Sequence, residues 1–152
     1  MRKILTFMKR NSAKPLLALG AIFILLSFAS CKKDKTNPAD TDRATIEQYA
    51  EDNNLKGQFT SSGLYYVIEV PGSANHPTLY SKVTVSYKGY HLDGTYLDQG
   101  DFYTAYLNNL IRGWQEGIPY IGEGGTIKLV IPSYLAYNNG VLVFDVTLYY
   151  FE

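Results

Sequence analysis

The feature that most constrains the fold of this chain is the run at residues 110–117, Leu-Ile-Arg-Gly-Trp-Gln-Glu-Gly, which holds the only tryptophan of the 152 residues. Asn108 and Asn109 precede the run as candidate helix caps, and its final glycine, followed by Pro119, ends any helix within about two turns. The apolar side chains, Trp114 among them, crowd one side of such a helix. The pattern therefore predicts a short helix with one apolar side.

Tyr-rich segments on both sides of this run alternate apolar and polar residues, which is the period of strands with one buried face. Asp93-Gly94 is a strong signal for a two-residue hairpin, and Asn139-Gly140 marks a second reversal. We therefore expect an α+β domain in which an antiparallel sheet wraps over one short helix. The expected strands are residues 64–70, 82–92, 95–98, 102–106, 126–131 and 141–151.

Residues 1–30 have the order of a secretory signal, with positive charges first, an apolar stretch at residues 15–28 and small residues last. Ala29-Ser30-Cys31 resembles the lipobox of bacterial lipoproteins, in which the cysteine is lipidated and becomes the mature N-terminus, although Phe28 replaces the common leucine. The alternative is an uncleaved anchor helix. Both predict a domain tethered to a membrane outside the cytoplasm, in the periplasm or at the cell surface.

The charge balance changes once this leader is removed. Residues 1–30 carry five of the 14 Lys+Arg and none of the 14 Asp+Glu, so the remaining chain has a net charge of −5. Such a chain cannot replace the counterions of nucleic-acid phosphates, which argues against nucleic acid as a partner. A lone Cys31 also excludes an internal disulfide.

Between the cysteine and the main domain, two short segments differ in pattern. Residues 31–43 are polar and lack an apolar period, which predicts a flexible linker. In residues 44–61, apolar positions recur at helical spacing from Ile46, so we expect a short helix capped by Asp42 and then a lead-in to the main domain at residues 62–152.

The sequence offers few reactive groups. His76 and His91 have no Cys or Glu at ligand spacing, so we expect no metal and no cofactor, and no Ser or Cys stands in a nucleophile motif. The glycines at residues 122–125 precede a strand pattern, which favours a turn over a phosphate cradle. Asp98 is either a partly buried site residue or a turn or cap residue. An aromatic pocket remains, which suits peptide binding or the noncovalent twisting of an X-Pro bond.

Five motifs stand in order within about residues 62–151. They are Val85-Ser86-Tyr87-Lys88-Gly89, Leu92-Asp93-Gly94-Thr95-Tyr96-Leu97-Asp98, the run at residues 110–117, Ile131-Pro132-Ser133-Tyr134-Leu135-Ala136-Tyr137 and Leu142-Val143-Phe144-Asp145-Val146. Together they resemble FKBP-type peptidyl-prolyl cis-trans isomerases.

The resemblance implies a curved sheet around the helix, a pocket between them, and an activity that needs no cofactor. It implies that Trp114 is the pocket floor, that the Ile111 N–H donates to a substrate carbonyl, and that Asp98 is the polar side chain at the rim. The implied walls are Tyr87, Leu97, Phe102, Leu110, Tyr137 and Phe144. Strand tyrosines and phenylalanines are otherwise more often simple core residues.

Three departures from the family pattern weaken water exclusion. Leu97 replaces a phenylalanine, the loop from Asp98 to Phe102 is short, and only residues 138–141 stand where family members carry a long loop over the pocket. We therefore predict a membrane-tethered, monomeric isomerase that acts on proline-containing segments of exported proteins. The alternatives are a degenerate peptide-binding module or chaperone, and a structural lipoprotein of an envelope complex.

Overall fold

The computed structural model describes residues 37–152, so the expected signal at residues 1–30 and Cys31 lie outside the described residues. In this described part of the chain, six strands form one antiparallel sheet in the order β1-β2-β5-β6-β3-β4. The strands are β1 (Gln58–Phe59), β2 (Tyr65–Val70), β3 (Lys82–His91), β4 (Tyr96–Tyr106), β5 (Thr126–Ile131) and β6 (Leu142–Phe151). The helices are α1 (Pro38–Asp52) and α2 (Arg112–Gly117), with 3₁₀ turns η1 (Leu107–Asn109), η2 (Ile118–Tyr120) and η3 (Ser133–Leu135).

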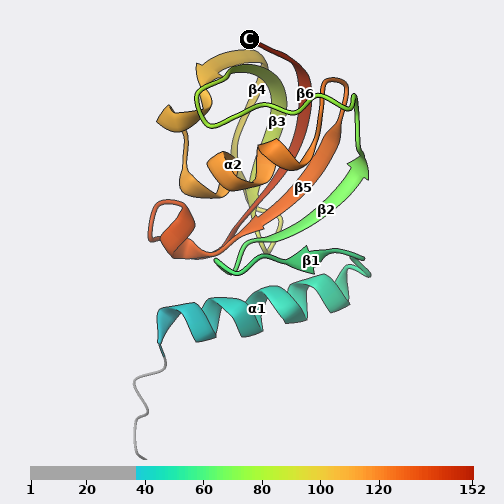
Figure 1. Ribbon diagram of the computed structural model, residues 1–152. Coiled ribbons are helices and arrows are strands. Elements are labelled where there is room, and N and C mark those ends of the chain that lie inside the picture. The colour runs from blue at the N-terminus through green and yellow to red at the C-terminus, as the bar shows by residue number, and fades with distance from the viewer. Residues whose placement is uncertain (1–36) are drawn as a thin grey trace, which may run out of the picture. The chain divides into compact units, whose positions relative to one another are not determined.

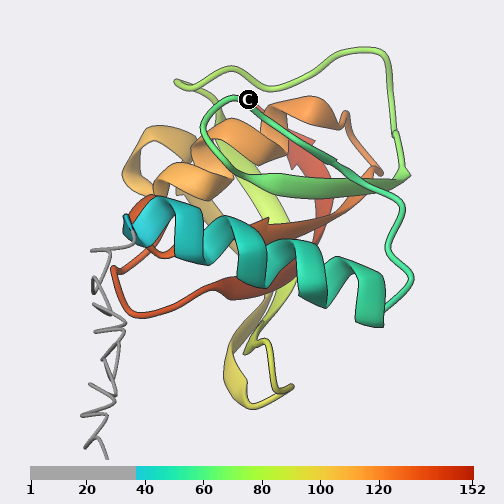
Figure 2. The same cartoon turned by 90° about the horizontal axis from the view of Figure 1, so that it is seen from below.

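The helix α2 packs on one face of this sheet and α1 covers part of the other (Figures 1 and 2). The two faces follow from the strand period, because successive residues point to opposite sides. On β5, Leu129 belongs to the core beneath α2, and the next residue, Val130, packs with Ile46 of α1. The α+β fold expected from the sequence is confirmed.

The sheet curves because its long central and edge strands carry irregularities. The register between β3 and β4 shifts at Val85/Tyr87 and at Gly89/Tyr90, and such bulges bend a strand and increase its twist. The expected strands at residues 95–98 and 102–106 are one continuous strand, β4, which pairs with β3 on both sides of the first shift. The turn at residues 122–125 is confirmed, with Gly124 at a φ of +77°.

The helix α1 begins earlier than the sequence suggested. Asn37, not Asp42, is its N-cap, and the Asn37 side chain accepts a hydrogen bond from the Ala39 N–H. Pro38 occupies the first turn, where its missing N–H costs nothing. Residues 38–43 are therefore helical, and the expected flexible linker is wrong for that part of the chain.

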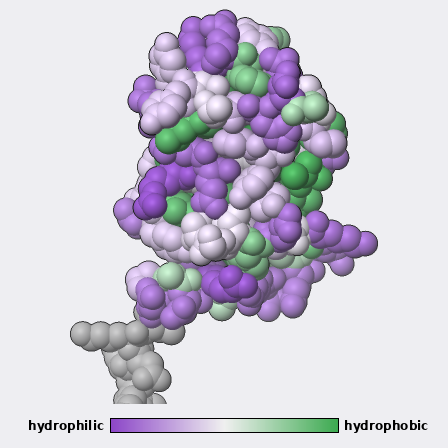
Figure 3. Space-filling view, viewed as in Figure 1, coloured by the Kyte–Doolittle hydropathy of each residue, from purple (hydrophilic) through white to green (hydrophobic). Residues whose placement is uncertain are grey.

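The view in Figure 3 shows a mostly hydrophilic surface on which apolar residues form separate small patches. Within residues 37–152, no helix is both long and apolar enough to cross a membrane. The same residues contain no group of His, Cys, Asp and Glu that could hold a metal ion.

Candidate functional site

A cavity of about 500 Å³ lies between α2 and the sheet, at the end of the sheet formed by β3, β4 and β6. Its walls come from segments far apart in the sequence, which the antiparallel pairing of these strands brings together. The lining residues are Tyr87, Leu97, Asp98, Tyr103, Asn109, Leu110, Ile111, Trp114, Tyr137 and Phe144. All but one of the residues predicted for the pocket are in this set, and the exception is Phe102.

Trp114 forms the buried base of the cavity, with 4% of its surface exposed. Tyr87 and Phe144 stand edge-to-face against its ring at centroid distances of 5.1 Å and 5.3 Å. Such T-shaped pairs are favourable arrangements of aromatic quadrupoles, worth about 0.5–1.5 kcal/mol each beyond burial. The Trp114 Nε1 has no hydrogen-bond partner among the described residues, so packing alone fixes the indole.

The polar groups of the cavity gather at its mouth. The Tyr87 hydroxyl donates to Asp98 Oδ2 at 2.7 Å, and Asp98 Oδ1 accepts from the Gln99 N–H at 2.8 Å. Burial, together with the hydrogen bond to Asp98, raises the pKa of Tyr87 above its ordinary value of about 10, so the phenol stays protonated at alkaline pH as well. Asp98 is thus a strand residue at the rim rather than a turn or cap residue.

The backbone before α2 differs from the expected capped helix. Ile111 is the N-cap, with no side-chain capping bond, and neither Asn108 nor Asn109 serves in that place. The segment before the helix is instead held by the Gln115 side chain, whose Nε2 donates a hydrogen bond to the Leu110 carbonyl oxygen at 2.7 Å. Within residues 37–152 the Ile111 N–H donates to no protein acceptor, so this cavity-lining donor is available to a ligand.

The prediction that Phe102 lines the pocket is wrong. Phe102 is 63% exposed and stacks on Tyr149 at 4.5 Å outside the cavity, and Tyr103 lines the cavity instead. The cause is the bulge between β3 and β4, where Val85 pairs with Tyr103 and Tyr87 pairs with Gly100. Phe102 lies in the bulge with a φ of +51°. Counting alternate residues from Asp98 through Gly100 selects Phe102, and the extra residue in the bulge moves the cavity face to Tyr103 instead.

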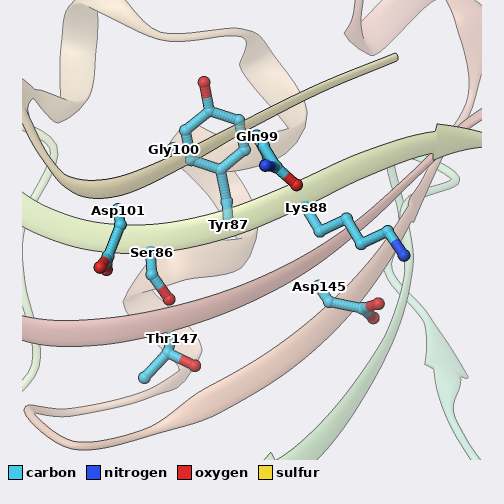
Figure 4. Close-up of a pocket in the computed structure, with 8 residues that line it drawn as sticks. All are labelled: Ser86, Tyr87, Lys88, Gln99, Gly100, Asp101, Asp145 and Thr147. Carbon is cyan, nitrogen blue, oxygen red and sulfur yellow. The ribbon is translucent and has the colours of Figure 1, made fainter. Parts of the chain in front are cut away.

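A second hollow, of about 470 Å³, lies on the other side of the same strands. Its side chains are hydrophilic and include Lys88, Asp101 and Asp145, and Figure 4 shows the Tyr87 ring pointing away from Asp145 and Thr147. The Tyr87 ring therefore belongs to the cavity over Trp114, and this hollow is a polar surface of the sheet.

The cavity is open on one side, as the short segment after Tyr137 predicted. Tyr137 is 64% exposed, and only residues 138–141 separate it from β6. Among the described residues, no His, Cys, Ser or Lys lines this cavity. An apolar base, the Tyr87–Asp98 hydrogen-bonded pair and a spare N–H can bind an apolar side chain and one carbonyl, without covalent chemistry.

Comparison with known proteins identifies the family of this chain. The family model for FKBP-type peptidyl-prolyl cis-trans isomerase matches residues 73–149. The isomerase FkpA of Escherichia coli (strain K12) is 35% identical over 133 residues, which cover 79% of this chain and 48% of that protein. FkpA of Buchnera aphidicola subsp. Schizaphis graminum is 41% identical over 103 residues, covering 59% of this chain and 41% of that protein.

Solved structures share the fold. The crystal structure of FkpA from Escherichia coli has a TM-score of 0.66 and 34% identity, covering 75% of this chain and 61% of that one. A peptidyl-prolyl isomerase from Pseudomonas syringae pv. tomato has a TM-score of 0.64 at 23% identity, covering 76% of this chain and 97% of that one. At this level of identity the likeness supports the fold alone. The chain spans less than half the length of these curated relatives. With the matched pattern over half its residues, the chain belongs to the family of FKBP-type peptidyl-prolyl cis-trans isomerases.

Proposed function

We propose that this protein is a peptidyl-prolyl cis-trans isomerase that helps exported proteins to fold. The observation that carries the proposal is the cavity in which Tyr87 and Phe144 stand against the Trp114 ring beside the spare Ile111 N–H. A proline ring fits an apolar aromatic base, and the N–H can hold a neighbouring substrate carbonyl. The family match supports the same activity.

The chemistry asked of such a site is modest. Rotation about an X-Pro bond has a barrier of roughly 18–20 kcal/mol that comes from amide resonance, and a twisted amide is less dipolar than a planar one. A cavity that removes water from the amide and binds the twisted form better lowers this barrier without an acid, a base or a nucleophile. The role of this chain in the reaction is to bind the proline-containing segment, to orient its X-Pro amide and to exclude water from that amide.

The open side of the cavity supports a second candidate, a peptide-binding chaperone with little catalysis. Tyr137 leaves more than half of its surface to solvent, and Leu97 offers a thinner wall than a phenylalanine. Water that reaches the amide stabilises its planar, dipolar form, which reduces the rate advantage of binding. Binding without acceleration is the expected signature of this candidate.

Magnetisation-exchange NMR on a short X-Pro peptide distinguishes the two candidates. We expect the protein to accelerate cis-trans exchange, and Tyr137→Ala to reduce that acceleration while leaving the fold intact because the side chain is 64% exposed. Tyr150→Ala is the matched control, since Tyr150 is 47% exposed and lies outside the cavity. Binding without acceleration supports the chaperone, and neither binding nor acceleration refutes both.

We further propose that a lipidated Cys31 tethers the domain to a membrane outside the cytoplasm. The support is the order of charged, apolar and small residues that ends at this cysteine, and the absence of any other cysteine in the sequence. Acyl chains contribute about 0.8 kcal/mol per buried methylene, so a multiply acylated residue holds firmly. Labelling cells with a fatty-acid probe tests this, and labelling that persists in Cys31→Ser would refute the tether.

A further inference from the structure

The loop that carries Tyr137 into the cavity wall is held by backbone hydrogen bonds more than by packing. Tyr137 itself is 64% exposed, so its own contacts fix it weakly. Asn138 has a φ of +57° and Gly140 a φ of +77°, conformations that a chain adopts only where its surroundings impose them or the residue tolerates them. The position of the Tyr137 ring therefore depends on what anchors its neighbours.

Ser133 is that anchor. Its carbonyl oxygen accepts from the Ala136 N–H at 3.1 Å and from the Asn138 N–H at 2.9 Å. These two residues flank Tyr137 directly, so one carbonyl fixes the backbone on both sides of the tyrosine. Whatever orients Ser133 also orients the cavity wall.

Asp42 of α1 orients Ser133. Asp42 Oδ2 accepts from the Ser133 N–H at 2.8 Å and from the Ser133 hydroxyl at 2.6 Å. Hydrogen bonds to a carboxylate are roughly twice as strong as neutral ones, and two from one residue also fix its direction. Asp42 lies 91 positions from Ser133 in the sequence and before the segment that matches the family.

A second connection ties the same loop to the helix that carries the indole. The Tyr134 hydroxyl donates to the Ser62 carbonyl at 2.8 Å, and the Ser62 hydroxyl donates to Glu116 Oε2 at 2.5 Å. Burial, followed by the Asp42 and Glu116 carboxylates, raises the pKa of Tyr134, which keeps its hydroxyl a donor. This connection holds the start of the loop, and the Asp42 pair holds the backbone around Tyr137.

We propose that Asp42 is a positioning residue for the substrate site, through which α1 sets the place of Tyr137 where no long loop covers the cavity. The effect of Asp42 on catalysis rests on the proposed function, whereas the anchoring of the loop by Asp42 does not. The helix α1 is thus part of the site, acting through Ser133.

Amide hydrogen exchange in the full chain tests the anchoring. Asp42→Ala should speed exchange at the Asn138 and Ala136 amides about tenfold, which corresponds to about 1.4 kcal/mol. Alanine is a good helix former, so α1 should persist. Asp42→Asn keeps one acceptor and should give a smaller effect. Asp40→Ala is the matched control, because Asp40 is an exposed acid in the first turn of the same helix. Unchanged protection of both amides in Asp42→Ala overturns the proposal.

A double-mutant cycle tests the consequence for the site. Asp42→Ala should lower kcat/KM for an X-Pro peptide by about three- to tenfold, since small misplacements of site groups are costly. In a Tyr137→Ala background the same change should have almost no further effect on kcat/KM. A loss that persists there overturns the positioning role. A wild-type chain without isomerase activity would overturn the proposed function instead, and the amide exchange would still decide whether Asp42 holds the loop.

Discussion

Gly113 lies on the side of α2 that faces the sheet, one residue before the indole that forms the base of the cavity. A Cβ added there would meet Ile131 Cγ2 at 2.5 Å and Ile131 Cδ1 at 2.8 Å. We predict that Gly113→Ala destabilises the protein, although alanine is the better helix former. The two effects have opposite signs, so the structure decides the outcome.

The magnitude follows from the two effects. Replacing glycine by alanine within a helix stabilises it by roughly 0.5–1 kcal/mol. Carbon atoms pack best at about 3.5–4.0 Å, so a contact about 1 Å shorter forces α2 away from β5 or Ile131 out of its rotamer, and such overpacking costs about 1–3 kcal/mol. The midpoints of these two ranges differ by about 1 kcal/mol, which is the expected net loss in the free energy of unfolding.

Urea unfolding of the full chain measures this difference, provided that the dependence on denaturant is unchanged. Arg112→Ala is the control, because Arg112 is the exposed neighbour on the same helix and should change stability by less than about 0.5 kcal/mol. In the double mutant with Ile131→Ala the colliding atoms are gone, so the combined loss should be smaller than the sum. A Gly113→Ala protein as stable as the wild type or more so would refute the reasoning.

Three further predictions follow. Tyr87→Phe keeps the ring but removes the hydrogen bond to Asp98, and should lower kcat/KM by a factor of about five, measured with an X-Pro peptide; no change would show that this bond is irrelevant to the site. The cavity lining formed by residues 37–152 has no His, Cys or Lys, and burial keeps Tyr87 protonated. We therefore expect kcat/KM to be constant from about pH 6 to about pH 9, and a bell-shaped profile would contradict noncovalent twisting. Burial raises the pKa of Tyr49 and of Tyr90 to about 12, whereas tyrosines in the unfolded chain ionise at a pH of about 10. The unfolded state therefore loses these protons first, so the free energy of unfolding should fall as the pH rises from about 10 to about 12. Tyr49→Phe should flatten that fall in base titrations followed by circular dichroism, and an equally steep fall would count against the assignment.

Much of the fold could be predicted because it rests on local patterns. The alternation in residues 82–92 and 126–131 predicted β3 and β5 almost to the residue, since a half-buried strand needs that period whatever its neighbours are. The hairpin at Asp93-Gly94 followed from turn chemistry, and Gly94 has the positive φ of 83° that this chemistry requires.

The site was predicted less completely, because part of it depends on register and on contacts distant in sequence. Motifs indicate Trp114 and Phe144, but the structure has Tyr103 in the wall where the sequence predicts Phe102, because a bulge is invisible to residue counting alone. Asp42 was predicted to cap α1, whereas its carboxylate accepts from Ser133. No pattern in one sequence indicates that pair.

The amino-acid sequence by itself determined the strands, the short helix and the aromatic residues available for a pocket, because these follow from side-chain period, turn residues and residue type. The tertiary structure alone decided which aromatic residue closes the cavity wall, which residue of α1 contacts Ser133, and how far Tyr137 is exposed to water. The physical reason is that hydrogen-bond register and long-range carboxylate contacts, such as Asp42 with Ser133, are fixed only when all strands and helices pack together.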